Sequence, residues 1–328
     1  MNTIIYKFLT IVIVLLTSSL ACAQVQDYTS TGSVHQVPTT VSESAQEFLS
    51  ALLPMPGLAN ETVVDEAVVQ LRQTVEDVEV REIAGVPVDI ITPNDCQEDN
   101  DDIAIYIHGG GWVLYKAQYP LAYKFADDLG LKVYSIDYRQ GARHLYPDTL
   151  DDCFAVYQEL LKEFGAENVV MLGDSSGGNM VLTTVLKARK NGLLLPAAVA
   201  LLSPCVDLTG ASDSIYTNDG FDPILTKEFL LSSYEAYPAG NNPTDPLISP
   251  LYANFSEGFP PTIISTGTRD LLLSESSRLY QTMKDDGVKV ELNVWEGMWH
   301  VFEAIPIPEA EESRQEIVDF LKDELAER

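Results

Sequence analysis

Short apolar runs alternate with segments of helical spacing from about residue 86 to the end of the chain. β-Rich runs are predicted at 86–92, 103–108, 132–137, 168–173, 197–203, 262–267 and 288–295. Helices are predicted between most of them, at about 118–130, 149–164, 177–191, 274–286 and 309–327. Several β runs are apolar throughout, as in strands covered on both faces of a mainly parallel sheet. The alternation predicts one doubly wound α/β domain.

Two segments depart from this alternation of strands and helices. Helical spacing also occurs before the sheet, over 42–53 and 60–75, on either side of a Pro-Met-Pro-Gly break. The interval 205–259 contains no clear strand and one helical piece near 225–234. An irregular insertion of this length in a compact domain is usually functional, often as a lid.

The first residues are typical of a secretory signal. Lys7 precedes an apolar run over 8–16, and Ala21-Cys22-Ala23 provides small residues at the positions that a signal peptidase reads. The run is short for a membrane span. We therefore expect cleavage near Ala23 and a secreted or periplasmic protein, with no stable membrane insertion. An uncleaved N-terminal anchor and lipidation of Cys22 are the alternatives.

The net charge of the chain disfavours several classes of binding partner. Lys and Arg total 20 against 49 Asp and Glu, so the formal net charge is −29. Nucleic-acid binding is disfavoured because it requires cations that neutralise phosphates, and docking on anionic lipid is disfavoured for the same reason. The 46% of hydrophobic residues is ordinary for a folded protein. The acidic residues mostly avoid the motif segments, which indicates a solvated acidic surface, tolerance of salt and a preference for neutral substrates.

The cysteines and acidic clusters do not indicate a metal site or a cofactor. Cys96, Cys153 and Cys205 follow the leader with wide spacing, which leaves open one disulfide plus a free thiol, or three free thiols. There is no CxxC pair, and the acidic cluster at 94–102 lacks the glycine of an EF-hand loop. We expect that cluster to be a solvated turn.

A serine motif lies where a strand is predicted to meet a helix. Gly173-Asp174-Ser175-Ser176-Gly177 follows the apolar run at 168–173 and opens the helix at 177–191. In G-x-S-x-G the glycines allow strand and helix to approach closely, which forces the serine into a strained, exposed turn. The helix N-terminus there favours developing negative charge. This context predicts Ser175 as a nucleophile.

A serine nucleophile needs a base and an orienting acid. The chain has four histidines: His35, His108, His144 and His300. In folds that carry G-x-S-x-G between a strand and a helix, the nucleophile comes first, then the acid, then the histidine, and only His300 follows both Ser175 and a candidate acid. Asp270 comes just after the run at 262–267, so it is the predicted acid, with Glu275 as the substitute.

A glycine run follows the strand at 103–108. His108-Gly109-Gly110-Gly111 exposes successive backbone N–H groups that can converge on a carbonyl oxygen. This is an oxyanion hole of the HGGG type, completed by the N–H of Ser176. A phosphate-binding loop is the competing interpretation, but the GKS/T ending is missing.

Together these motifs resemble the hormone-sensitive-lipase-like branch of the α/β-hydrolases over about residues 80–325. The matching pieces are HGGGW at 108–112, DYR at 137–139, GDSSGG at 173–178, the Asp270 turn and GMWHVF at 297–302. The resemblance implies an α/β-hydrolase fold with a mainly parallel eight-stranded sheet flanked by helices, and a helical cap from about 24–75 and 205–259. The whole domain would span 24–328.

The resemblance also implies roles for individual residues. Ser175, Asp270 and His300 would form the triad, and Gly110, Gly111 and Ser176 would be the oxyanion donors. His108, Gly109 and Asp174 would support the motifs.

Three departures from the family pattern stand out. The family usually has Ala where this chain has Ser176, and Leu-Ala-Pro-Glu where it has the residues 140–143. The residues 271–274 (LLLS) replace the usual Pro-Leu-x-Asp and, with GMWHVF, are closer to the lactone-hydrolase and small-ester branch.

The favoured function is a secreted serine carboxylesterase that acts on short neutral esters or lactones through an acyl-enzyme. An amidase or peptidase on the same triad, and a ligand-binding protein without catalysis, are the alternatives. The aromatic residues that are candidates for the lining of a substrate pocket are Trp112, Tyr115, Phe221, Tyr234 and Trp299, with core or cap packing as the alternative for each. The partner is a small ester or lactone, and the sequence leaves both a monomer and a homodimer open.

Overall fold

The computed structural model describes residues 37–52, 71, 74–96, 100–256 and 258–327. The expected signal segment, Cys22, His35 and most of the helix predicted at 60–75 lie outside these residues. Among the described residues, no helix combines the length and the apolar character needed to cross a bilayer. Cys96, Cys153 and Cys205 are free thiols.

Eight strands in the described residues form one sheet in the order β1-β2-β4-β3-β5-β6-β7-β8. Their bounds are β1 (Asp77–Ile83), β2 (Val86–Thr92), β3 (Ile103–Ile107), β4 (Lys132–Ile136), β5 (Val169–Asp174), β6 (Ala198–Leu202), β7 (Thr262–Gly267) and β8 (Val290–Trp295). β1 and β2 pair antiparallel, as do β2 and β4, and all other neighbours are parallel. This confirms the mainly parallel eight-stranded sheet.

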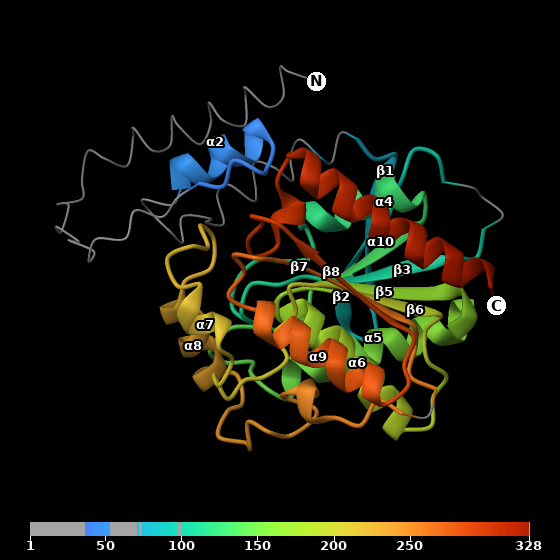
Figure 1. Ribbon diagram of the computed structural model, residues 1–328. Helices are drawn as coiled ribbons and strands as arrows, with labels where there is room; N and C mark the ends of the chain where they lie inside the picture. The colour runs from blue at the N-terminus through green and yellow to red at the C-terminus, as the bar shows by residue number, and fades with distance from the viewer. Residues whose placement is uncertain (1–36, 53–70, 72–73, 97–99, 257, 328) are drawn as a thin grey trace. The chain divides into compact units, whose positions relative to one another are not determined.

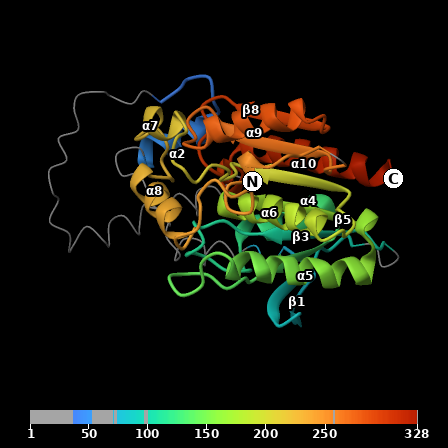
Figure 2. The same cartoon turned by 90° about the horizontal axis from the view of Figure 1, so that it is seen from below.

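Helices cover both faces of the sheet (Figures 1 and 2). The helices are α2 (Glu43–Leu52), α4 (Pro120–Leu129), α5 (Asp148–Phe164), α6 (Ser176–Lys190), α7 (Ser214–Thr217), α8 (Lys227–Ala236), α9 (Leu273–Asp285) and α10 (Pro308–Ala326). Short 3₁₀ turns are η1 (Ala166–Asn168), η2 (Pro250–Tyr252) and η3 (Phe302–Ala304). The helices α4 and α10 pack on one face and α5, α6 and α9 on the other.

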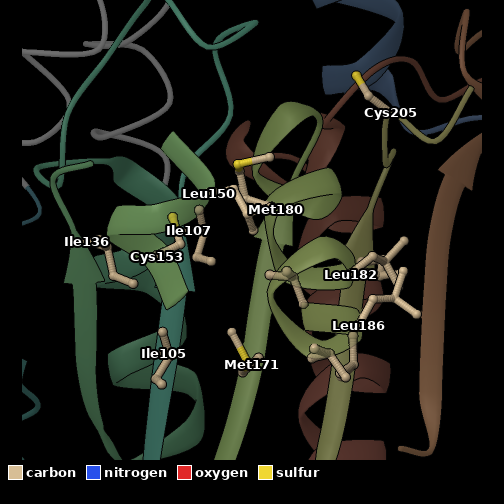
Figure 3. Close-up of a cluster of buried hydrophobic side chains, with 14 of the residues drawn as sticks. Ile105, Ile107, Ile136, Leu150, Cys153, Met171, Met180, Leu182, Leu186 and Cys205 are labelled. Carbon is tan, nitrogen blue, oxygen red and sulfur yellow. The ribbon is translucent and has the colours of Figure 1, made fainter. Parts of the chain in front are cut away.

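The core explains why the central strands are apolar throughout. Every residue of β3, β5, β6 and β7 is buried, because side chains on each face meet a helix layer. Figure 3 shows one face of this core, where Ile105, Ile107 and Met171 of the sheet lie among side chains such as Leu150 and Met180.

The strand β1 was not predicted. Its sequence, DVEVREI, carries four charged residues, and most of its side chains are partly or fully exposed. Among the described strands it pairs only with β2, at the edge of the sheet. Tertiary pairing therefore gives it a strand conformation that its composition does not predict.

The insertion between β6 and β7 contains α7, α8 and η2 and no strand in its described part, as the sequence predicted. In both views α7 and α8 lie at the same end of the sheet, near α2 (Figures 1 and 2). The helix α2 packs there through Ala45 and Leu49 against Trp299 and Phe302. This end of the sheet carries the motif residues.

Candidate active site

The predicted nucleophile lies in a sharp turn between β5 and α6. Ser175 has φ 53° and ψ −121°, a backbone conformation that non-glycine residues rarely adopt. Its N–H donates to the carbonyl of Leu202 (2.8 Å), which anchors the turn to β6. A Cβ at Gly177 would collide with the carbonyl oxygen of Ile107, so only glycine allows α6 to approach β3 this closely.

Three residues distant in sequence form a hydrogen-bonded chain. Ser175 Oγ lies 3.0 Å from His300 Nε2, and His300 Nδ1 lies 3.1 Å from Asp270 Oδ1. Asp270 follows β7 and His300 lies between β8 and η3. All three are buried, with exposed fractions of 8%, 6% and 0% for Ser175, His300 and Asp270.

The surroundings of Asp270 fix the direction of these bonds. Its carboxylate also accepts from Thr266 Oγ1 (2.8 Å) and from the N–H of Leu272 (2.9 Å). Burial acts to raise the pKa of Asp270, but His300 and the hydrogen bonds outweigh it and hold the pKa below its ordinary value. Because an ionised Asp270 only accepts, His300 Nδ1 donates to it and Nε2 is left to accept from the Ser175 hydroxyl.

The charge state of His300 follows from the same contacts. Burial acts to lower the pKa of His300, but the carboxylate of Asp270 and its hydrogen bond, with the charges of Asp222 and Asp174, raise it above 6.5. The site therefore favours an imidazolium that forms when the serine proton is taken up.

Backbone N–H groups without protein acceptors among the described residues occur on both sides of the nucleophile in the fold, in the glycine loop and at the start of α6. Gly110 and Gly111 lie in the loop after β3, and Ser176 is the first residue of α6. Within the described part of the chain, their N–H groups have no protein acceptor. Unpaired N–H donors suit an oxygen that gains negative charge, and Ser176 adds the N-terminus of α6.

The supporting motif residues hold this loop in place. Asp174 accepts from the N–H of Gly109 (3.1 Å) and from the hydroxyls of Tyr106 (2.6 Å) and Tyr119 (3.3 Å). His108 Nδ1 donates to the carbonyl of Gly109 (2.8 Å). Burial lowers the pKa of His108 to about 4, so this histidine stays neutral and acts as a structural donor.

A cavity of about 180 Å³ opens beside Ser175. Its lining residues come from the glycine loop, the nucleophile turn, the histidine loop and the insertion: Gly110, Gly111, Leu114, Tyr115, Tyr119, Asp174, Ser175, Ile224, Leu225, Thr226, Phe229, His300 and Val301. The insertion therefore forms one wall of the cavity.

The structure corrects most of the predicted aromatic lining. Tyr115 lines the cavity, but Trp112 is fully buried and stacks on Tyr237 with ring centroids 4.1 Å apart. Trp299 is also buried and stacks on Phe48 at 4.8 Å, and Phe221 lies under the guanidinium of Arg269. In these three places large rings fill core or cap packing.

Tyr234 and Glu275, the substitute acid, also lie elsewhere. The Tyr234 hydroxyl donates to the carboxylate of Glu275 (2.9 Å). The other Glu275 oxygen accepts from the N–H groups of Val206 (2.6 Å) and Asp207 (2.9 Å). Burial raises the pKa of Glu275 to about 8. Glu275 therefore binds the backbone at the start of the insertion. The acid that bonds to His300 is Asp270.

Several neighbours of the site were not foreseen from the sequence. Asp222 accepts from the N–H of His300 (3.0 Å), and Cys205 Sγ lies 3.8 Å from Ser175 Oγ. Both lie in the insertion, where no motif distinguishes them. The only sequence signal was the Asp-Pro pair at 222–223, a common turn start. No group of three His, Cys, Asp or Glu within the described residues is placed to hold a metal ion.

A strained serine between strand and helix, bonded to a histidine and an acid from later loops, defines an α/β-hydrolase with a serine active site. A profile of the alpha/beta hydrolase fold matches residues 104–304. An esterase of Acinetobacter venetianus is 31% identical over 69% of this chain and 76% of its own length. The chain belongs to the α/β-hydrolase family.

Two further similarities define its branch and its reaction. An acetyl-hydrolase of Streptomyces hygroscopicus is 29% identical over 66% of this chain and 76% of its own. The crystal structure of a hormone-sensitive lipase from a metagenome library matches with a TM-score of 0.77 and 29% identity, over 86% of this chain and 98% of that one. The chain is thus a hormone-sensitive-lipase-like serine hydrolase of the carboxylic-ester class.

Proposed function

We propose that the protein hydrolyses short-chain neutral esters or lactones, with Ser175 as the nucleophile. The observation that carries this proposal is the hydrogen-bonded chain from Ser175 through His300 to Asp270, beside a cavity of about 180 Å³. Ser175 Oγ attacks the ester carbonyl while His300 Nε2 takes the hydroxyl proton. Asp270 stabilises the imidazolium that results.

The N–H groups of Gly110, Gly111 and Ser176 hold the oxyanion of the tetrahedral intermediate. Collapse of the intermediate releases the alcohol, which takes the proton from His300, and leaves an acyl-serine. Water then attacks the acyl group by the same route and frees the carboxylic acid. In a lactone the alcohol and acid stay in one molecule, and the product is a hydroxy acid.

The size of the cavity and the net charge of the chain support the substrate class. The small cavity of about 180 Å³ beside the nucleophile supports a short acyl group. The acetyl-hydrolase among the relatives agrees with a short acyl group. A net charge of −29 disfavours anionic substrates such as fatty-acid salts.

The test is a substrate profile of the purified protein and its Ser175→Ala variant. We expect turnover of p-nitrophenyl acetate and butyrate, a steep fall for long acyl chains, and loss of turnover in the variant. A lactone of matched size, followed by proton release, separates the lactonase from the esterase activity. An ester and an anilide with one acyl group show whether amides are also cleaved. A profile that rises toward long chains would contradict the proposal.

We also propose that the mature protein is secreted or periplasmic. The support is the leader at 1–23 with its Ala-Cys-Ala end. Mass spectrometry of the N-terminus from native cells tests this. Cleavage near Ala23 is expected, whereas an intact leader in the membrane fraction would overturn it in favour of an anchor.

A further inference from the structure

A segment of the insertion, residues 214–226, contacts both loops that carry the acid and the base of the site. We call it the clamp segment. Asp222, at its centre, is fully buried. Its Oδ2 accepts from the backbone N–H of His300 (3.0 Å), and its Oδ1 accepts from the N–H groups of Ile224 (2.8 Å) and Leu225 (2.9 Å). One carboxylate therefore joins the histidine loop to the cavity wall.

Asn218 makes the matching contact with the acid loop. Its Nδ2 donates to the carbonyl of Asp270 (2.8 Å) and to the carbonyl of Thr268 (3.2 Å). Ser214 adds a third attachment, because its hydroxyl donates to the carbonyl of Leu271 (2.7 Å). The main chain on both sides of the His300–Asp270 bond is thus held from one segment.

Burial of the Asp222 carboxylate costs solvation free energy. A buried carboxylate loses hydration, and here it also lies near a second buried carboxylate, Asp270. Burial, and then the charge of Asp270, raise the pKa of Asp222 to about 7, while the charge of His300 opposes this. An amide of equal size would avoid the repulsion, but its NH₂ group cannot accept a hydrogen bond. The three N–H groups that the two oxygens of Asp222 accept from therefore favour a carboxylate.

The groups around Asp222 show what its charge acts on. His300 and Asp270 are the titratable groups that face it from the neighbouring loops. On its own segment Asp219 pairs with Lys227 (2.5 Å). Arg269 lies over the ring of Phe221. The charge of Asp222 therefore acts on both members of the His300–Asp270 pair.

We propose that Asp222 and Asn218 are positioning residues, which hold His300 and Asp270 in register and tie the acyl-pocket wall to the base. This inference rests on the triad proposed above. Substrate that presses on the wall at residues 224–226 acts through Asp222 on the main chain of His300. Neither side chain touches the reacting atoms, so both act through the triad.

The first test is Asp222→Asn, which keeps the volume but removes the charge and leaves only one acceptor oxygen. We expect kcat for p-nitrophenyl acetate to fall between about ten- and a hundredfold, as small misplacements in a triad do. The acid limb of kcat/KM moves to lower pH, because the variant removes an anion that favours the imidazolium. A purely structural role would lower the melting temperature and leave this limb in place.

Asp207→Asn is the matched control. Asp207 is also a fully buried acid of the insertion, but it pairs with Arg278 (2.5 Å), and its side-chain bonds in the described part of the chain do not reach the triad. Its variant is expected to lose stability and to keep the wild-type kcat and acid limb. Wild-type kcat and limb in folded Asp222→Asn, or the same changes in Asp207→Asn, would overturn the proposal.

Asn218→Ala decides the matter if Asp222→Asn does not fold. Asn218 is partly exposed, so its loss is easier to tolerate. We expect kcat to fall severalfold with KM and the acid limb unchanged, and wild-type kcat would refute the clamp. Absence of wild-type turnover, or full turnover in Ser175→Ala, would instead refute the proposed function.

Discussion

Gly111 offers a sharp test of the oxyanion hole. It lies in the loop after β3 with φ +62°, and its N–H has no acceptor among the described residues. A Cβ there would meet Ser233 Oγ at 2.9 Å and the ring of Phe229 at 3.0 Å, both on the cap helix α8. Gly111→Ala therefore strains the backbone and pushes against the cap.

Two costs follow from this geometry. A left-handed backbone costs a non-glycine residue about 1–2 kcal/mol, so the free energy of unfolding falls by that order. The loop relieves the strain by turning, which moves the N–H away from the oxyanion. Loss of one such donor lowers kcat by about 10²–10³, or about 2.7–4 kcal/mol of transition-state stabilisation. We expect kcat to fall by at least about a hundredfold, with a small change in KM.

Gly287→Ala is the matched control. Gly287 has φ +83°, and a Cβ at this position would meet no atom within 4 Å beyond its chain neighbours, so the substitution carries the backbone cost far from the site's loops. Steady-state kinetics with p-nitrophenyl acetate and urea unfolding are measured for both variants. Both should lose stability, with Gly111→Ala losing at least as much as Gly287→Ala because of its side-chain contacts, and only Gly111→Ala should lose kcat. Equal kcat in the two variants would refute the role of Gly111.

Three other predictions concern the base, the acid and the pocket. The pKa of His300 is raised above 6.5, and the base must be neutral, so kcat/KM should fall as the pH drops through a value above 6.5; a limb at lower pH would contradict this. Asp270→Asn should lower kcat by about 10⁴-fold through the wrong histidine tautomer, and a loss below tenfold would speak against Asp270 as the acid. Phe229→Ala opens the pocket wall, so kcat/KM for hexanoate relative to acetate esters should rise by about fourfold for each extra buried methylene. An unchanged ratio would show that Phe229 does not limit the acyl chain.

The chemistry of the site was more predictable than its surroundings. The positions of Ser175, Asp270 and His300 followed from motifs whose strand and helix context was already visible in the apolar pattern. These elements are local, and the ends of parallel strands meet at one edge of the sheet. The structure accordingly places the three side chains in one hydrogen-bonded chain.

The surroundings of the site include features that the sequence did not predict. Trp112 and Trp299 were candidates for the pocket lining with core packing as the alternative, and they fill the core, where large rings bury the most apolar area. Asp222 and Asn218 were not identified because the triad loops that they contact lie fifty or more residues away along the chain. Such contacts depend on tertiary packing and leave no periodic pattern.

The most direct test of the account is covalent labelling of the nucleophile. The wild-type protein is treated with a fluorophosphonate and the adduct is mapped by peptide mass spectrometry. We predict one adduct per chain, on Ser175, no adduct in Ser175→Ala, and much slower labelling in His300→Ala. Labelling at another residue, or equal labelling of the wild type and Ser175→Ala, would contradict the assignment of this site.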